Sequence, residues 1–261
     1  MQKDGEIVPV DGSGIKIGVI SDSYNTQPFT GKTRAAVDVE NGDLPGPENP
    51  NGFLAQIDVV KDFPYGTATD EGRAMLQLIH DIAPGAELAF NTGVLSPRDF
   101  EIAINNLDNA GCNILVEDIT FASEPMFGES RISRTIKDFT AKPGRAYFTS
   151  AGNFSDDGYQ SNFVSSSNLP PTNFIPGGSN TVAHVFGNNT NGTEDVFQKI
   201  QGVKGTYMMV LQWDEKMASQ QNGDGAVTDL DIYVVDDYGN LLVGNNRFNP
   251  GGDPTAFLVF Q

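Results

Sequence analysis

Three polar side chains stand where catalytic groups are often found in α/β proteins. Asp22 follows the apolar run 15–20, Glu71 lies in the first turn of a predicted helix, and Asn153 ends the segment 144–153. Carboxylates transfer protons, and a carboxamide donates hydrogen bonds to negative charge. Each residue also has an ordinary structural explanation, as a turn residue or as a side chain that complements a helix dipole. Residue types and spacing alone therefore indicate carboxylates near strand ends and leave the reaction open.

The elements that must position these residues alternate between strand and helix. Short apolar runs predict strands, and apolar residues at helical spacing between capping and breaking residues predict helices. The expected strands cover 15–20, 55–63, 86–92, 113–121 and 144–153, and the expected helices cover 70–83, 96–111 and 130–142. A long surface loop is expected over 22–52, because Gly, Pro, Asn and Asp crowd 41–52. The alternation predicts an open α/β sheet, doubly wound and mostly parallel.

The helical period disappears after about residue 160. Apolar pieces separated by turn residues follow at 181–187, 207–214, 229–237, 240–244 and 256–261. Several short strands of this kind predict an antiparallel β-sandwich. We therefore expect two domains, an α/β domain over 1–165 and a β-sandwich over 166–261.

Composition excludes several classes of protein. The 261 residues include 34 acidic and 16 basic side chains, a formal charge of −18, which argues against binding to nucleic-acid phosphates. The single cysteine, Cys112, has no partner for an internal disulfide. No apolar run is long enough to span a membrane, and the segment 1–10 lacks the apolar stretch of a signal peptide.

Three blocks resemble the subtilisin-like serine peptidases, in the same order as in that family. They are GIKIGVISDS (14–23), DEGRAMLQLIHDIAPGAEL (70–88) and the Ala-Gly-Asn turn at 151–153. The resemblance covers about residues 14–155 and implies a subtilisin-like fold. It further implies that Asp22 is the aspartate of the catalytic triad and that Asn153 donates a hydrogen bond to the oxyanion.

The chain departs from that family at the general base, because Glu71 stands where the family has histidine. In this respect it is similar to the sedolisins, acid-active relatives that use Glu with Ser. Their second carboxylate lies on the same helix as the Glu, but Met75 occupies that position here, so the resemblance implies that Asp22 is the partner of Glu71. His80 lies about 13 Å further along the helix and cannot replace Glu71; we interpret it as a structural residue.

The nucleophile is the second departure. The family motif Gly-Thr-Ser-x-x-x-Pro does not occur, and Ser166 lacks the preceding Gly-Thr and is followed by Pro170-Pro171, which oppose a helix there. We interpret Ser166 as a serine in a polar loop. The nucleophilic serine is expected beyond Gln261 in a longer natural protein, so that the chain by itself is expected to be inactive.

The implied function is that of a serine endopeptidase. A serine attacks the peptide bond of a polypeptide substrate, Glu71 accepts its proton, Asp22 orients Glu71 and shares a proton with it, and Asn153 stabilises the oxyanion. No cofactor is needed for this chemistry, activity is expected to shift to acid pH, and the location is expected to be extracellular or periplasmic. Asp118 receives no catalytic role. The alternative is an inactive pseudo-peptidase whose β-sandwich binds protein, glycan or calcium.

The predicted sandwich has a resemblance of its own. The segment GDGAVTDLDIYVVDDYGNLLVG (223–244) looks like strands of jelly-roll modules appended to secreted bacterial peptidases. Asp229 and Asp231 alternate along one strand, so both carboxylates share a face and could hold a structural Ca²⁺. Because the spacing of an EF-hand is missing, a solvated acidic face is the other explanation.

Overall fold

The computed structural model describes residues 2–3, 6–7, 10–154, 157–167, 181–220 and 223–261. The chain falls into two compact units, one formed by 1–124 and 130–153 and the other by 125–129 and 154–261. The sequence placed the boundary after residue 165, whereas the units divide after Asn153, soon after the alternation of strand and helix ends. No helix within the described ranges has the length and apolar character needed to cross a membrane.

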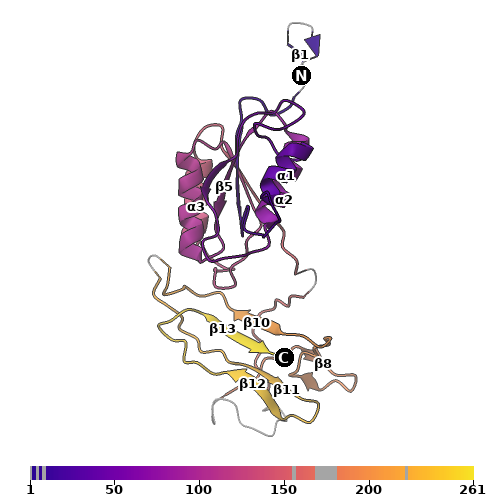
Figure 1. Ribbon diagram of the computed structural model, residues 1–261. Coiled ribbons are helices and arrows are strands. Elements are labelled where there is room, and N and C mark those ends of the chain that lie inside the picture. The colour runs from indigo at the N-terminus through magenta and orange to yellow at the C-terminus, as the bar shows by residue number, and fades with distance from the viewer. Residues whose placement is uncertain (1, 4–5, 8–9, 155–156, 168–180, 221–222) are drawn as a thin grey trace. The chain divides into compact units, whose positions relative to one another are not determined.

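The first unit is built on a five-stranded parallel sheet with helices, which confirms the predicted α/β character (Figure 1). A separate short hairpin, β1 (Gln2–Lys3) with β2 (Glu6–Ile7), precedes it. The sheet strands are β3 (Lys16–Ser21), β4 (Asp58–Lys61), β5 (Glu87–Thr92), β6 (Ile114–Glu117) and β7 (Ala146–Thr149), in the order β4-β5-β3-β6-β7. The helices are α1 (Arg34–Asn41), α2 (Glu71–Ile82), α3 (Pro97–Asn109) and α4 (Arg131–Thr140).

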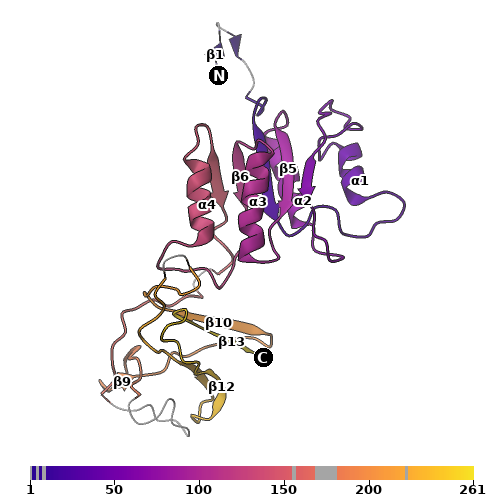
Figure 2. The same ribbon diagram turned by 90° about the vertical axis from the view of Figure 1, so that its left-hand side faces the viewer.

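Helices cover both faces of this sheet. In Figure 1, α1 and α2 lie on one side of the sheet and α3 lies on the other, and Figure 2 shows α3 and α4 side by side. Leu76 of α2 packs with Val19 and Phe90 on the first face, and Leu107 of α3 packs with Ile20 on the second. The strands β3, β5 and β6 therefore each contribute side chains to two cores, as a doubly covered sheet requires.

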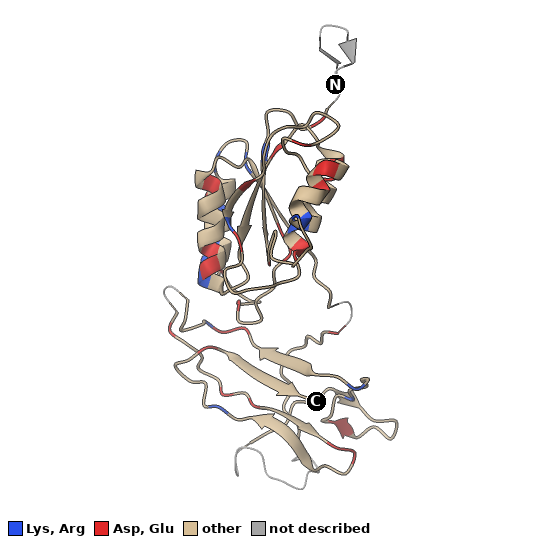
Figure 3. Cartoon of the chain, viewed as in Figure 1, with Lys and Arg blue, Asp and Glu red and all other residues tan. Residues whose placement is uncertain are grey.

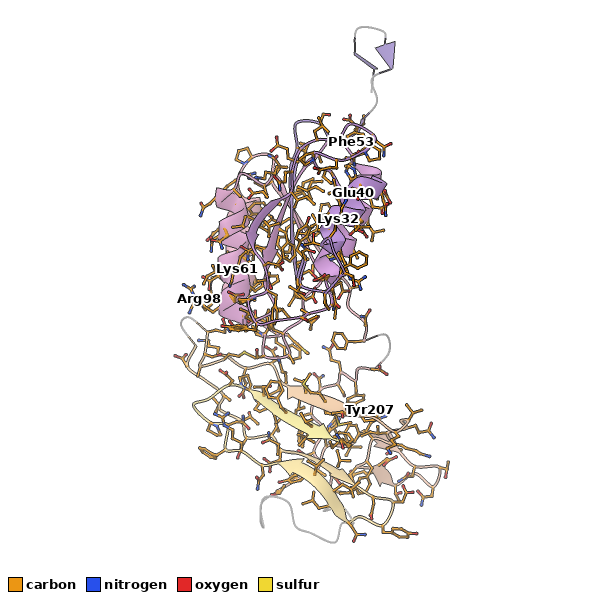
Figure 4. All side chains as sticks on the ribbon, in the orientation of Figure 1. Lys32, Glu40, Phe53, Lys61, Arg98 and Tyr207 are labelled. Carbon is orange, nitrogen blue, oxygen red and sulfur yellow. The ribbon has the colours of Figure 1, made fainter. Side chains whose placement is uncertain are left out.

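One helix was not expected. Residues 34–41 form α1 within the stretch predicted to be a surface loop, so that prediction is wrong for this segment. Thr33 caps the helix by accepting a hydrogen bond from the N–H of Ala36, and Lys32 forms an ion pair with Glu40 along it (Figure 4). Leu44, which follows α1, is fully buried. The helix and the buried residue were not predicted, because glycines and prolines dominate the composition of 41–52 and favour a loop.

The chain leaves the ends of β3 and β6 in opposite directions. After β3 it runs to β4, on the β5 side of the sheet, and after β6 it runs to β7, at the other edge. The connection after β3 carries α1, and the one after β6 carries α4. Such a switch point leaves an opening at the carboxyl ends of the two neighbouring strands, where ligands bind in open α/β sheets.

The second unit contains short antiparallel strands. Within its described residues they form three pairs: β8 (Gly187–Asn188) with β9 (Glu194–Asp195), β10 (Tyr207–Gln212) with β13 (Thr255–Phe260), and β11 (Ile232–Val235) with β12 (Leu241–Asn245). The antiparallel pairing is confirmed, but these pairs are separate two-stranded sheets, and a sandwich is not established. Acidic side chains occur on elements of both units (Figure 3).

Candidate active site

Asp22 lies directly after β3 and binds the beginning of α2 with its carboxylate. Oδ2 accepts hydrogen bonds from the backbone N–H and the hydroxyl of Thr69, both at 2.6 Å, and Oδ1 accepts one from the backbone N–H of Glu71 at 2.9 Å. The first N–H groups of a helix have no partner inside the helix. Asp70, which precedes α2, makes no side-chain capping bond. Asp22 therefore caps α2 from a position 49 residues before Glu71.

These hydrogen bonds keep the Asp22 carboxylate ionised. Burial alone would raise its pKa, but the hydrogen bonds from Thr69, Ser23 and Glu71 outweigh burial, and the pKa lies below its ordinary value. The sequence led us to expect a proton shared between the side chains of Asp22 and Glu71. Across the described residues no hydrogen bond joins those side chains; Asp22 holds the backbone of Glu71 instead. Asp22 thus positions Glu71 through the helix.

The carboxylate of Glu71 is exposed at the first position of α2. The part of the chain that the structure describes gives this side chain no hydrogen bond and no ion pair. Gly72 brings the helix close to the sheet at this point: a Cβ atom there would lie 2.3 Å from a ring carbon of Phe90 and 2.8 Å from the backbone oxygen of Ser23. A glycine after Glu71 is therefore needed for the approach.

Asp70 anchors the loop after β3 to the start of α2. Its carboxylate accepts hydrogen bonds from the hydroxyl of Ser23 at 2.9 Å, from the backbone N–H of Thr26 at 2.8 Å and from Arg73 at 2.5 Å. Burial opposes ionisation, but the hydrogen bonds from Thr26, Gln27 and Arg73 lower the pKa to about 2.

The backbone of Asp70 is strained. Its φ of 59° makes it the one non-glycine residue with positive φ in the described ranges. A residue with a side chain pays a conformational penalty in this left-handed region, and such strain is concentrated at functional sites. Here it occurs immediately before Glu71, and the buried hydrogen bonds of the Asp70 carboxylate hold it in place.

Asn153 lies on the same edge of the sheet, beyond the end of β7. Its side chain is exposed, and Gly152 before it has a φ of 77°, so the chain turns sharply there. Because β6 separates β7 from β3, the ends of those two strands are about 10 Å apart. The fold thus brings Asp22 and Glu71 into contact and leaves Asn153 across the opening from them.

Asp118 also lies at this edge of the sheet, although no catalytic role was expected for it from the sequence. It directly follows β6, accepts a hydrogen bond from the Ser21 hydroxyl at 3.1 Å, and has a buried Oδ1 atom without a partner. Burial, with the negative charges of Glu71, Glu117 and Asp22, raises its pKa to about 6. The sequence placed Asp118 inside an expected strand over 113–121, and only the end of β6 at Glu117 puts it directly after a strand, as Asp22 is after β3.

Two other residues that the sequence brought into consideration as catalytic, His80 and Ser166, make contacts within the folded structure. His80 is buried and meets Phe53 edge-on, with ring centroids 5.3 Å apart, and burial lowers its pKa. Ser166 is also buried; its hydroxyl donates a hydrogen bond to Glu194 at 2.8 Å, and its backbone N–H pairs with Ala183. Ser166 belongs to the second unit, whereas Glu71 belongs to the first.

The predicted calcium ligands each have a protein partner. Asp229 accepts a hydrogen bond from the backbone N–H of Asn249 at 3.0 Å, and Asp231 accepts one from the hydroxyl of Tyr233 at 3.0 Å. The described stretches contain no group of three or more His, Cys, Asp or Glu side chains arranged to hold a metal ion. The two aspartates therefore offer a pair of carboxylates, and calcium binding there stays a prediction.

The groups at the sheet edge support proton transfer. They comprise an exposed carboxylate, an ionised carboxylate that positions it, and a neighbouring buried carboxyl with a raised pKa. The surroundings lower the pKa of Asp22 and raise that of Asp118, and carboxyl groups separated in this way are typical of general acid–base sites. The chain matches no protein-family model, no curated protein and no solved structure.

Proposed function

We propose that this chain forms the first part of the catalytic domain of a serine endopeptidase, with Glu71 as the general base. One observation carries the proposal: Asp22 holds the backbone of Glu71 so that an exposed, unpaired carboxylate stands at the switch point of the sheet. A general base needs a fixed position and an oxygen free to accept a proton, and Glu71 has both.

In the proposed reaction the nucleophile is a serine from sequence that follows Gln261 in a longer protein. Its hydroxyl oxygen forms a bond to the carbonyl carbon of the substrate while Glu71 takes the hydroxyl proton. Glu71 then returns that proton to the leaving amine as the peptide C–N bond breaks, which leaves an acyl-enzyme. Water hydrolyses the acyl-enzyme by the same proton transfers in reverse order.

Asn153 is the proposed donor to the oxyanion. Its exposed carboxamide beyond the end of β7 suits a substrate that lies across the opening from Glu71. A preorganised donor of this kind acts where charge develops in the transition state, and its loss reduces kcat by about 10²–10³ in known cases. The substrate class that fits these roles is a polypeptide, and the chemistry needs no cofactor.

The finer features expected from the sequence belong to the same proposal. The five parallel strands would be the first part of a subtilisin-like sheet, and the antiparallel pairs of the second unit would form a jelly-roll-like β-sandwich inserted after it. Asp229 and Asp231 would hold a structural Ca²⁺ there. An enzyme of this class would act outside the cytoplasm, in the extracellular space or the periplasm.

A fluorophosphonate probe tests the proposal, because it reacts with serines that a neighbouring base activates. We expect the natural protein that contains this chain to be labelled on one serine, and Glu71→Gln to remove most of the labelling. Glu87→Gln is the matched control, because Glu87 is an exposed glutamate at the opposite end of the parallel strands.

Labelling that is equal in Glu71→Gln, Glu87→Gln and the unmodified protein would contradict the role of Glu71. A folded natural protein with no labelled serine would contradict the peptidase function itself. In that case a pseudo-peptidase whose second unit binds a ligand would be the better account.

A further inference from the structure

Asp118 directly follows β6, as Asp22 directly follows β3. The two strands pair in parallel with Ile20 opposite Glu117, so the next residues, Ser21 and Asp118, are neighbours, and Asp22 follows. Neighbouring strands lie about 4.8 Å apart. Asp118 therefore lies next to the end of β3, close to the residue that positions Glu71.

The two oxygens of the Asp118 carboxyl have different surroundings. Oδ2 accepts a hydrogen bond at 3.1 Å from the hydroxyl of Ser21, whose side chain is fully buried. Oδ1 is buried too, and no atom of the described residues forms a hydrogen bond with it. An unpaired charged oxygen costs far more free energy to bury than an unpaired neutral one. The geometry thus favours a proton on Oδ1.

The charged groups that act on Asp118 are all acidic. They come from the three elements around it: Glu71 from α2, Asp22 from the end of β3, and Glu117 from β6 itself. Arg73, the cation nearest the start of α2, forms ion pairs with Asp38 and Asp70. A third negative charge at this edge would add to the repulsion, so the cluster favours one neutral carboxyl.

We propose that Asp118 is a positioning residue of this site, whose carboxyl keeps a proton on Oδ1 while Glu71 accepts the proton of the serine. The proposal deepens the peptidase function proposed above and rests on it. The proton of Asp118 is not transferred in the reaction; it limits the negative charge at the place where the oxyanion develops.

This arrangement gives the reaction an upper pH limit. As pH rises through about 6, Asp118 loses its proton and places a further negative charge beside Glu71. Because that charge repels the developing oxyanion, hydrolysis should fall to a lower rate as pH rises above this value. Asp118→Asn keeps a neutral side chain of the same shape and should retain activity at neutral pH.

The test is a carboxyl NMR titration of the 261-residue chain, which needs no peptidase activity. We expect Asp118 to titrate near pH 6, and Glu71→Gln to move its midpoint to lower pH because one neighbouring negative charge is gone. Glu87→Gln, at the far end of the strands, should leave the midpoint unchanged. An Asp118 midpoint near the ordinary aspartate value, or one that ignores Glu71→Gln, would overturn the proposal.

The pH profile of peptide hydrolysis by the natural protein completes the test. Loss of the upper pH limit in Asp118→Asn supports the role in the reaction, and an unchanged profile overturns it while leaving the peptidase function intact. If the titration behaves as expected but the folded natural protein cleaves no peptide at any pH, the peptidase function fails, and with it the role of Asp118 in catalysis.

Discussion

The two units of the chain bury their hydrophobic side chains to different extents. In the first unit the large residues Val19, Ile20, Leu76, Phe90, Leu107 and Leu115 are almost wholly inaccessible. In the described part of the second unit, the buried hydrophobic residues are Met217, Ala226, Ala256 and Leu258, while Tyr238, Phe248 and Val259 are more than 60% exposed. A sheet covered on both faces buries whole side chains, whereas separate strand pairs leave one face open.

This difference explains where a catalytic site would be stable. A site needs groups held by a rigid scaffold. Asp22 and Asp118 directly follow buried strands of the first unit, and Glu71 is the first residue of a helix that packs on the same sheet. Asp229 and Asp231 of the second unit precede β11, whose residues are only partly buried. The comparison therefore favours the first unit as the location of chemistry.

The largest expected effect comes from the first core. Phe90→Ala should lower the free energy of unfolding by about 3–5 kcal/mol, since the ring is fully buried, whereas Phe248→Ala, at 74% exposure in the second unit, should change it by less than about 0.5 kcal/mol. Urea unfolding followed by far-UV circular dichroism reports on the described helices, which all belong to the first unit, and the single tryptophan, Trp213, reports on the second. Equal losses of unfolding free energy in Phe90→Ala and Phe248→Ala would contradict the difference between the two units.

Gly72→Ala tests the close approach of α2 to the sheet. The added methyl group would overlap the ring of Phe90 and the backbone of Ser23, so we expect a loss of about 1–3 kcal/mol in the free energy of unfolding. Gly128→Ala is the control, because no atom lies within 4 Å of a Cβ built there and its φ is not positive. If both variants unfold at the same urea concentration, the helix is not held as described.

Much of this scaffold can be predicted from the sequence, because it depends on local patterns. The apolar spacing between Asp70 and Pro84 gives a helix, and α2 covers Glu71–Ile82. The contacts at the sheet edge depend on strand order, which local patterns do not contain. Asp118 becomes a neighbour of Asp22 only because β6 pairs with β3, and for this reason its part in the site was missed.

Asp118→Asn should make the stability of the first unit less dependent on pH. The pKa of Asp118 rises from 3.8 to about 6 on folding, so the folded state binds the proton more tightly, and the stabilisation present below pH 3.8 is lost as pH rises through about 6. The variant has no such loss and should be more stable near neutral pH by about 1–2 kcal/mol, after allowance for solvent screening. Thermal unfolding at several pH values checks this, with Asp138→Asn, an exposed aspartate on α4, as the control. A constant difference across pH would contradict it.

Asp22→Asn should have the smallest effect, lowering the free energy of unfolding by about 1 kcal/mol. The loss is small because one side-chain oxygen remains to accept a hydrogen bond. There is a loss because the new amide group faces the N–H donors of Thr69 or Glu71. The pKa of Asp22 is lowered on folding, so its stabilisation is present above the ordinary aspartate pKa and is lost as pH falls through the folded value. Asp81→Asn, at the other end of α2, should not destabilise the helix, since a negative charge there opposes the dipole. Equal losses from the two changes, seen by circular dichroism on heating, would refute the capping role.

The central claim is that Glu71 is the base of a peptidase. Its most direct measurement is the hydrolysis of unfolded casein by the natural protein across about pH 3 to pH 9, beside the Glu71→Gln variant. The account predicts cleavage that is strongest at acid pH and vanishes in the variant while the fold, seen by circular dichroism, is kept. Cleavage that persists in Glu71→Gln, or a folded protein that cleaves at no pH, would contradict it.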